Sequence, residues 1–153
     1  MELMIYSPAE NERLPEIQWN FEEIKKYVVD QDLEGAVAFL GMQTNVYQYI
    51  NAADIFILPS LYEGIPMTLI EAMGTGIPIV ATNVGGIPNM LSNNESALLT
   101  SVDSQEIADS LIRLSEDVRL RKKLGQNALE RSQEFSSREM ARQYIKIYQG
   151  GNQ

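Results

Sequence analysis

Short apolar runs alternate with segments of helical pattern along residues 1–100, and this alternation limits the fold more than any other feature. The runs predict strands at Leu3–Tyr6, Val37–Leu40, Ile55–Leu58, Ile77–Ala81 and Ala97–Leu99. The segments between them predict helices at Phe21–Val29, Val46–Ala53, Pro66–Met73 and Pro88–Leu91. Short strands without polar alternation are typical of a parallel sheet that is buried on both faces. Because parallel neighbours need crossover connections, this order predicts an α/β fold with a Rossmann-like, doubly wound sheet and helices on both faces.

The last third of the chain is predicted to be helical. Two pairs of residues have the spacing of capping boxes, which open helices: Asp103 with Glu106, and Ser136 with Glu139. An apolar stripe follows each pair, and a further helix, Val118–Arg131, lies between them. No repeat or low-complexity linker interrupts the sequence, so we expect residues 1–153 to form a single domain.

Charge and composition exclude several classes of function. The formal net charge is −9, from 21 acidic and 12 basic residues, whereas a nucleic-acid-binding protein needs a basic surface. The chain contains no histidine and no cysteine. Its residues therefore cannot form a Ser-His-Asp or Cys-His catalytic site, and the commonest zinc ligands are absent.

The segment 60–73 follows a predicted strand and opens a helix, which is where doubly wound proteins bind ligands. Pro66 is favoured at the first helical position, and Gly64 lets the backbone approach a ligand. The amides near Met67 and Thr68 can face an anion at the positive end of the helix dipole. Glu63 precedes them in the loop, so this segment is a candidate binding site.

Glu71 lies in the same helix, among the apolar residues Leu69, Ile70, Ala72 and Met73. This pattern predicts a helix that is apolar nearly all round, in which an unpaired carboxylate is costly. Sugar or ribose hydroxyls would supply suitable donors, because an ionised carboxylate accepts two hydrogen bonds at once. The alternative from the residues alone is a structural glutamate that is bonded to backbone or water.

A second candidate loop contains Gly85 and Gly86, after the predicted strand Ile77–Ala81 and before a short helix. Two glycines at this place would let the backbone meet a phosphate or a sugar. A tight turn that requires positive φ explains the same pair equally well.

Two other acidic patterns have weaker context. Asp30 and Asp32 match an Asp-x-Asp metal motif, but they stand where acids and glycine mark the end of a helix. Glu63 and Glu71 could be the acid and base of a glycoside hydrolase, although nothing in their spacing requires it.

Taken together, four groups of residues resemble one known family. They are Ala52-Ala53-Asp54-Ile55-Phe56-Ile57-Leu58-Pro59-Ser60, Glu63-Gly64-x-Pro66, Glu71-Ala72-Met73-x-x-Gly76-x-Pro78-x-Val80-Ala81-Thr82, and Gly85-Gly86. This combination resembles the retaining glycosyltransferases called group 1, or family 4, over about Val37–Tyr148. The resemblance implies that the chain is one half of a GT-B fold, the C-terminal half that binds the donor.

The resemblance also assigns roles to residues. Glu63 would be the catalytic residue and would bind hydroxyls of the donor sugar, and Glu71 would bind the ribose. The sugar and diphosphate would contact six consecutive residues: Glu63, Gly64, Ile65, Pro66, Met67 and Thr68. Met42 and Gln43 would flank the nucleotide base. The family uses no metal and no cofactor, and its donor is a UDP- or GDP-sugar.

Some family features are not found in this sequence. The Arg and Lys that neutralise the leaving diphosphate would precede residue 1, and Ser7-Pro8-Ala9-Glu10-Asn11 replaces the usual glycine-rich turn. Asn89 stands where an acidic residue is common, and we do not expect residues 1–153 to include the acceptor-binding N-terminal domain. The isolated chain is therefore expected to bind nucleotide sugar without catalysing transfer.

By analogy, the full-length enzyme would transfer the sugar to a glycan or lipid-linked acceptor. It would work in the cytoplasm, at the inner face of the membrane and with peripheral membrane association. Two alternatives stay open: a non-catalytic module that binds nucleotide sugar or a partner, and a GT-B epimerase. Such epimerases usually rely on a histidine that this chain lacks.

Overall fold

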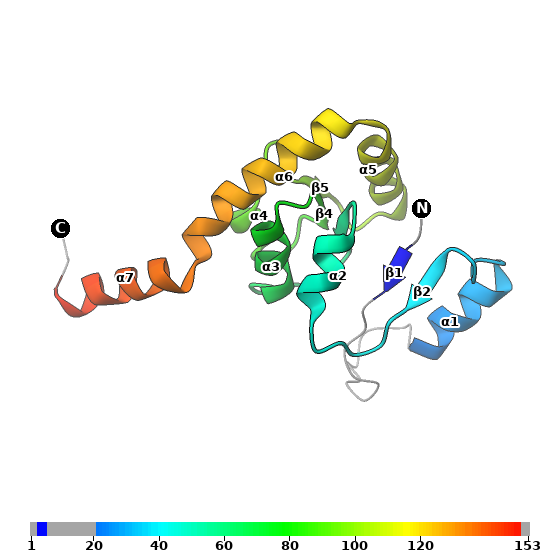
Figure 1. The fold of residues 1–153 in the computed structure, drawn as a ribbon, viewed down its shortest axis with the longest axis horizontal. Coiled ribbons are helices and arrows are strands. Elements are labelled where there is room, and N and C mark those ends of the chain that lie inside the picture. The colour runs from blue at the N-terminus through cyan, green and yellow to red at the C-terminus, as the bar shows by residue number, and fades with distance from the viewer. Residues whose placement is uncertain (1–2, 6–20, 151–153) are drawn as a thin grey trace. The chain divides into compact units, whose positions relative to one another are not determined.

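The computed structural model describes residues 3–5 and 21–150 (Figure 1). The chain divides into two compact units, Met1–Val46 and Tyr47–Gln153, and each unit is described by itself. The first contains β1 (Leu3–Ile5), α1 (Phe21–Asp30) and β2 (Val37–Phe39). The second contains the remaining elements, beginning with α2 (Val46–Ala52), whose first residue is the unit boundary.

In the first unit, β1 and β2 form a parallel pair in which Ile5 lies opposite Phe39. The Phe21 ring of α1 meets the Phe39 ring edge to face, with 5.4 Å between the ring centroids. Lys25 places its ammonium group 4.1 Å from the centroid of Phe21 on the same helix. The contact between the two rings packs α1 against β2, whereas the Lys25 contact lies within α1.

The end of α1 has the geometry of a Schellman motif. Asp32 adopts a φ of +53°. The Leu33 N–H donates to the Val28 carbonyl at 2.9 Å, and the Asp32 N–H donates to the Val29 carbonyl at 3.1 Å. This pattern pairs the last carbonyls of the helix and explains Asp32 as a helix-terminating residue.

The sheet of the second unit consists of three parallel strands in the order β3-β4-β5. They are β3 (Phe56–Leu58), β4 (Ile79–Thr82) and β5 (Leu98–Thr100). All four residues of the central strand β4 are buried, as expected for a strand covered on both faces. The carboxyl ends of the three strands lie at one edge of the sheet, because the strands are parallel.

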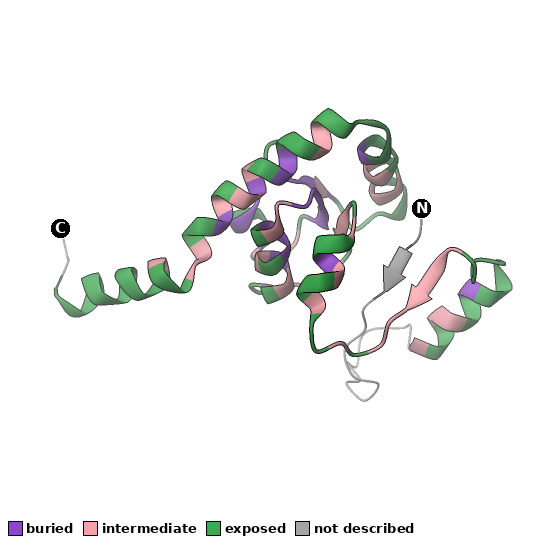
Figure 2. Ribbon diagram, in the orientation of Figure 1, coloured by how far each residue is buried: buried purple, intermediate pink, exposed green. Residues whose placement is uncertain are grey.

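The helices of the second unit connect these strands or follow them. After α2 they are α3 (Met67–Thr75), α4 (Ile87–Met90), α5 (Ser104–Glu116), α6 (Val118–Ser132), the 3₁₀ turn η1 (Gln133–Phe135) and α7 (Ser137–Tyr148). Val80 and Leu98 of the sheet form one core cluster with Leu114 of α5 and Leu124 of α6. Figure 2 shows buried residues at β4 and β5 and along one side of α6.

Close contact between α6 and the end of α3 fixes the position of α3. A Cβ atom at Gly125 of α6 would lie 2.0 Å from the carbonyl oxygen of Gly76, so a side chain there would force the backbones apart. Gly76 itself ends α3 in the left-handed conformation, with a φ of +72°.

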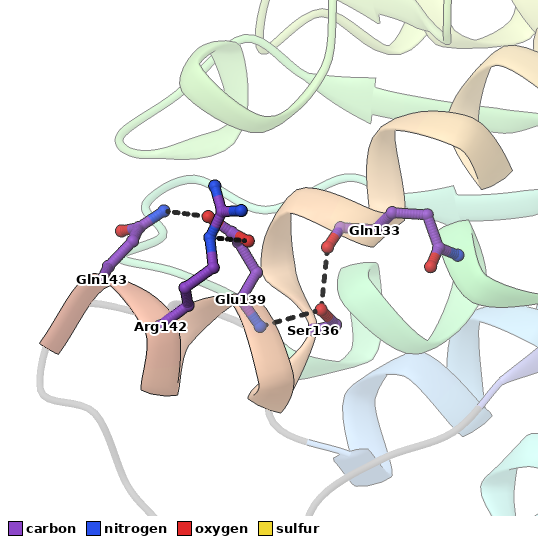
Figure 3. A network of polar contacts seen from close by, with 5 residues as sticks. All are labelled: Gln133, Ser136, Glu139, Arg142 and Gln143. Atoms are coloured by element: carbon purple, nitrogen blue, oxygen red, sulfur yellow. Dashed lines mark hydrogen bonds and ion pairs between the residues drawn. The ribbon is translucent and has the colours of Figure 1, made fainter. Parts of the chain in front are cut away.

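A polar network begins α7 (Figure 3). The Glu139 N–H donates to the Ser136 hydroxyl at 3.2 Å, and this hydroxyl donates to the Gln133 carbonyl at 2.9 Å. Arg142 forms an ion pair with Glu139 at 3.1 Å, and Gln143 donates to the other carboxylate oxygen at 3.4 Å. Every residue of α7 except Glu139 is exposed, so the predicted apolar stripe Met140, Tyr144 and Ile147 faces solvent (Figure 2).

The predicted α/β class, the parallel strands and the helical last third are confirmed. Where the structure describes them, the predicted element ends fall within two residues of the observed ones. The predicted caps Asp103 and Ser136 each accept from the N–H three residues on. The parallel strands form one sheet in each unit, and the single-domain organisation stays a prediction. Within residues 3–5 and 21–150, no helix is long and apolar enough to cross a membrane.

Candidate functional site

The two loops that the sequence singles out follow β3 and β4, which are neighbours in the sheet. Thr82, the last residue of β4, is completely buried, and its hydroxyl donates to the Ser60 carbonyl at 2.6 Å. This bond joins the end of β4 to the start of the loop that leaves β3. The register of the sheet therefore places the two candidate loops side by side.

The glycine pair packs directly onto the other loop. A Cβ atom at Gly85 would lie 1.7 Å from the Glu63 carbonyl oxygen, and one at Gly86 would lie 2.0 Å from the Gly64 carbonyl oxygen. Gly85 also has a φ of +53°. The Gly86 N–H donates to the Glu63 carbonyl at 3.3 Å. The turn and this backbone contact together explain why glycine occupies both positions. Their contact with a ligand stays a prediction.

Gly64 differs from this pair. A Cβ atom there would meet nothing within 4 Å, and the residue is exposed. Gly64 is also not among the glycines with positive φ. Among the described residues, neither crowding nor backbone conformation requires a glycine at position 64. The space beside the loop at Gly64 is therefore open.

Glu63 is half-buried, and its carboxylate is held by a neighbour in the same loop. The Ser60 hydroxyl donates to Glu63 Oε1 at 2.7 Å. Of the described residues, Ser60 alone bonds to this side chain. Sequence reasoning assigned no role to Ser60 or Thr82. The available signal was a hydroxyl residue at or just after the end of each strand: Thr82 ends β4, and Ser60 follows β3 by two residues.

The N-terminus of α3 follows this loop and has no side-chain cap. Pro66 is the N-cap, with φ −71° and ψ 118°, whereas the sequence predicted it at the first helical position. The amides of the first turn lack intrahelical acceptors, so those of Met67 and Thr68 remain available to an anion at the positive end of the helix.

Glu71 is exposed, so the predicted helix that is apolar nearly all round is wrong. Leu69, Ala72 and Met73 are buried, but Glu71 shares the exposed face of α3 with Met67 and Gly74. The cost of burying an unpaired carboxylate therefore supports no conclusion about Glu71. Its side chain makes no hydrogen bond or ion pair with any described residue and is accessible to a ligand.

The structure does not bring the remaining candidate residues together with these two loops. Met42 is 65% exposed and Gln43 is half-buried, both in the first unit, and their position beside a base stays a prediction. Asp30 and Asp32 belong to the end of α1, and no group of three or more potential metal ligands occurs among the described residues. The glycosidase alternative needs one of the two carboxylates in an apolar enclosure, but Glu71 is exposed and the half-buried Glu63 accepts a hydrogen bond from Ser60.

A pocket of about 330 Å³ lies at the opposite edge of the sheet. Asp54 and Pro78, which precede β3 and β4, line it together with Arg121 of α6. None of the predicted site residues contributes to this pocket. The candidate site at the carboxyl ends of the strands is formed instead by two loops and a helix N-terminus.

These features define a class: an α/β protein in which two touching loops and an uncapped helix N-terminus follow the carboxyl ends of parallel strands. The family model of the glycosyl transferases group 1 matches residues 18–131. The chain belongs to this family and corresponds to the C-terminal domain of its two-domain GT-B fold.

One curated relative is N-acetyl-alpha-D-glucosaminyl L-malate synthase of Bacillus anthracis, which is 35% identical over 127 residues. The match covers 82% of this chain and 33% of the relative, so the chain spans about a third of that protein.

Two solved structures share the fold. Sucrose-phosphate synthase from Thermosynechococcus elongatus has a TM-score of 0.84 and 28% identity, and the match covers 97% of this chain and 38% of that one. Anabaena HepE, solved in complex with UDP, has a TM-score of 0.82 and 26% identity, and the match covers 86% of this chain and 37% of that one. HepE has also been solved in complex with UDP-glucose.

Proposed function

We propose that the chain is the donor-binding domain of a retaining glycosyltransferase and holds a UDP- or GDP-sugar at the N-terminus of α3. The observation that carries this proposal is the uncapped helix N-terminus directly after the Glu63 loop, with Glu71 exposed on the same helix. The HepE complexes with UDP and UDP-glucose support it, since HepE shares this fold at 26% identity.

The groups around the N-terminus of α3 suit the parts of such a donor. The amides of Met67 and Thr68 would bind the diphosphate, because helix N-termini favour anions. Glu71 would accept hydrogen bonds from the two ribose hydroxyls, which a single carboxylate can do. Glu63 would bind hydroxyls of the donor sugar, next to the open space at Gly64.

In the transfer reaction, the bond between the anomeric carbon and the diphosphate oxygen breaks, and the anomeric carbon bonds to the oxygen of an acceptor hydroxyl with its configuration retained. The acceptor O–H bond breaks as well, and its proton would pass to the leaving diphosphate. Negative charge collects on the leaving diphosphate and must be stabilised. The α3 N-terminus would stabilise part of this charge, and cations from outside residues 1–153 would stabilise the rest. Glu63 would hold the reacting sugar by its hydroxyls, and the reaction would need no metal ion.

The acceptor is proposed to be a glycan or a lipid-linked sugar, bound by a separate N-terminal domain. The transfer would take place in the cytoplasm, near the inner face of the membrane. Because the acceptor meets the donor between two domains, the isolated chain would bind nucleotide sugar without transferring it.

Isothermal titration of the chain with UDP and with GDP tests this proposal, with and without EDTA. We expect one of the two nucleotides to bind, with the same affinity in both buffers. If neither nucleotide binds, the proposed donor site is refuted. Binding that disappears in EDTA would instead refute its independence from metal.

A further inference from the structure

The Glu63 carboxylate is anchored on one side only. Ser60 bonds to Oε1 at 2.7 Å, whereas no described residue bonds to Oε2. An ionised carboxylate has about four acceptor positions on its two oxygens, so this single bond leaves most of them for a ligand. The half-buried side chain is thus oriented while its second oxygen stays available.

Ser60 is itself fixed by the neighbouring strand. The buried Thr82 hydroxyl donates to the Ser60 carbonyl at 2.6 Å, and the Gly86 N–H donates to the Glu63 carbonyl at 3.3 Å. The short loop from Ser60 to Glu63 is therefore held at both ends by groups of β4 and of the loop after it. A glutamate side chain loses considerable rotamer freedom when it binds a ligand, and an arrangement fixed beforehand reduces that cost.

Resting on the proposed function, we propose that Ser60 and Thr82 are positioning residues for the sugar part of the donor. Ser60 orients the Glu63 carboxylate toward the sugar hydroxyls, and Thr82 holds Ser60 in place. The nucleotide part is bound by other groups, the α3 amides and Glu71. Loss of the Ser60 hydroxyl therefore weakens recognition of the sugar and leaves recognition of the nucleotide intact.

The test measures how much the sugar adds to the affinity of the chain for the nucleotide. UDP and GDP are titrated alongside UDP-glucose, UDP-N-acetylglucosamine and GDP-mannose. For each nucleotide sugar, its affinity is divided by the affinity of the same nucleotide without the sugar. The nucleotide sugar with the largest ratio is used. For Ser60→Ala, this ratio is expected to fall by about tenfold, the value of one hydrogen bond to an ionised group, with the nucleotide affinity unchanged. Ser60→Thr keeps a hydroxyl and is expected to restore the ratio.

Two further variants complete the design. Thr82→Val removes the buried hydroxyl at nearly constant shape and is expected to lower the same ratio. Ser115→Ala is the matched control, since that hydroxyl bonds, among the described residues, only to the Ile112 carbonyl within α5. Melting curves of all four variants show whether the fold is retained.

The outcomes separate the two proposals. If the unaltered chain binds neither UDP nor GDP, the proposed donor site is wrong and the positioning role falls with it. If a nucleotide binds but no sugar adds affinity, the nucleotide site stands, and the proposed contact of Glu63 with the sugar falls together with the positioning role. If a sugar adds affinity but Ser60→Ala keeps the full ratio, only the positioning role is overturned. An equal loss of nucleotide and nucleotide-sugar affinity in Ser60→Ala would also overturn it, since that result indicates a general loss of loop structure.

Discussion

A Cβ atom at Gly85 would lie 1.7 Å from the carbonyl oxygen of Glu63, so the loop after β4 and the loop after β3 touch backbone to backbone. Gly85 also has a φ of +53°, a conformation that is unfavourable for alanine. Gly85→Ala is therefore expected to lower the free energy of unfolding by about 3 kcal/mol, from backbone strain and overlap together. Urea denaturation measures this loss, and a change below about 0.5 kcal/mol would contradict the contact.

Gly64 provides the matched comparison, because a Cβ atom there meets nothing within 4 Å and its φ is not positive. Gly64→Ala should change the free energy of unfolding by no more than about 0.5 kcal/mol. The added methyl group would occupy the space proposed for the donor, so the affinity for nucleotide sugar should fall by roughly tenfold. Titration of the variant checks this, and an unchanged affinity would place the donor elsewhere.

Glu71→Gln tests the proposed ribose contact. The side chain is exposed and makes no bond with a described residue, so the free energy of unfolding should stay within about 0.5 kcal/mol. Hydrogen bonds to a charged acceptor are about twice as strong as neutral ones, and the affinity for UDP or GDP should fall by roughly tenfold. Glu116→Gln, at an exposed glutamate of α5, is the control and should bind as the unaltered chain does.

The expectation that Glu71 lies in a helix that is apolar nearly all round was wrong, because residue identity alone does not show which face of a helix is buried. Leu69, Ile70, Ala72 and Met73 surround Glu71 in the sequence, and they suggest burial. In α3, however, Met67, Glu71 and Gly74 follow one another at helical spacing and share the exposed face. The candidate residue could be found from the sequence, but its environment could not.

The strands and most helix ends could be predicted, because apolar runs and caps such as Asp103 and Ser136 act locally. The contact between Gly85 and Glu63 could not be predicted in the same way. It depends on β3 and β4 being neighbours with Leu58 opposite Ala81, which is a non-local property of the sheet. The Thr82–Ser60 bond depends on the same register, and it was missed for the same reason.

Ser136 offers a prediction about local order rather than global stability. Its hydroxyl accepts the Glu139 N–H and so caps α7 (Figure 3). Ser136→Ala should cost α7 about 1 kcal/mol, which corresponds to roughly fivefold faster hydrogen exchange of its amides. The midpoint of urea unfolding should stay nearly constant, because α7 has no buried residue and adds little to the core.

Ser136→Asp keeps a capping oxygen and should retain slow exchange in α7, whereas Ser115→Ala should leave α7 unaffected because its hydroxyl lies in α5. Mass-spectrometric exchange of the peptide covering Ser137–Tyr148 would separate these variants. If Ser136→Ala instead lowered the unfolding midpoint as much as a core substitution does, α7 would have to unfold together with the sheet. That result would contradict the exposure of every α7 residue except Glu139.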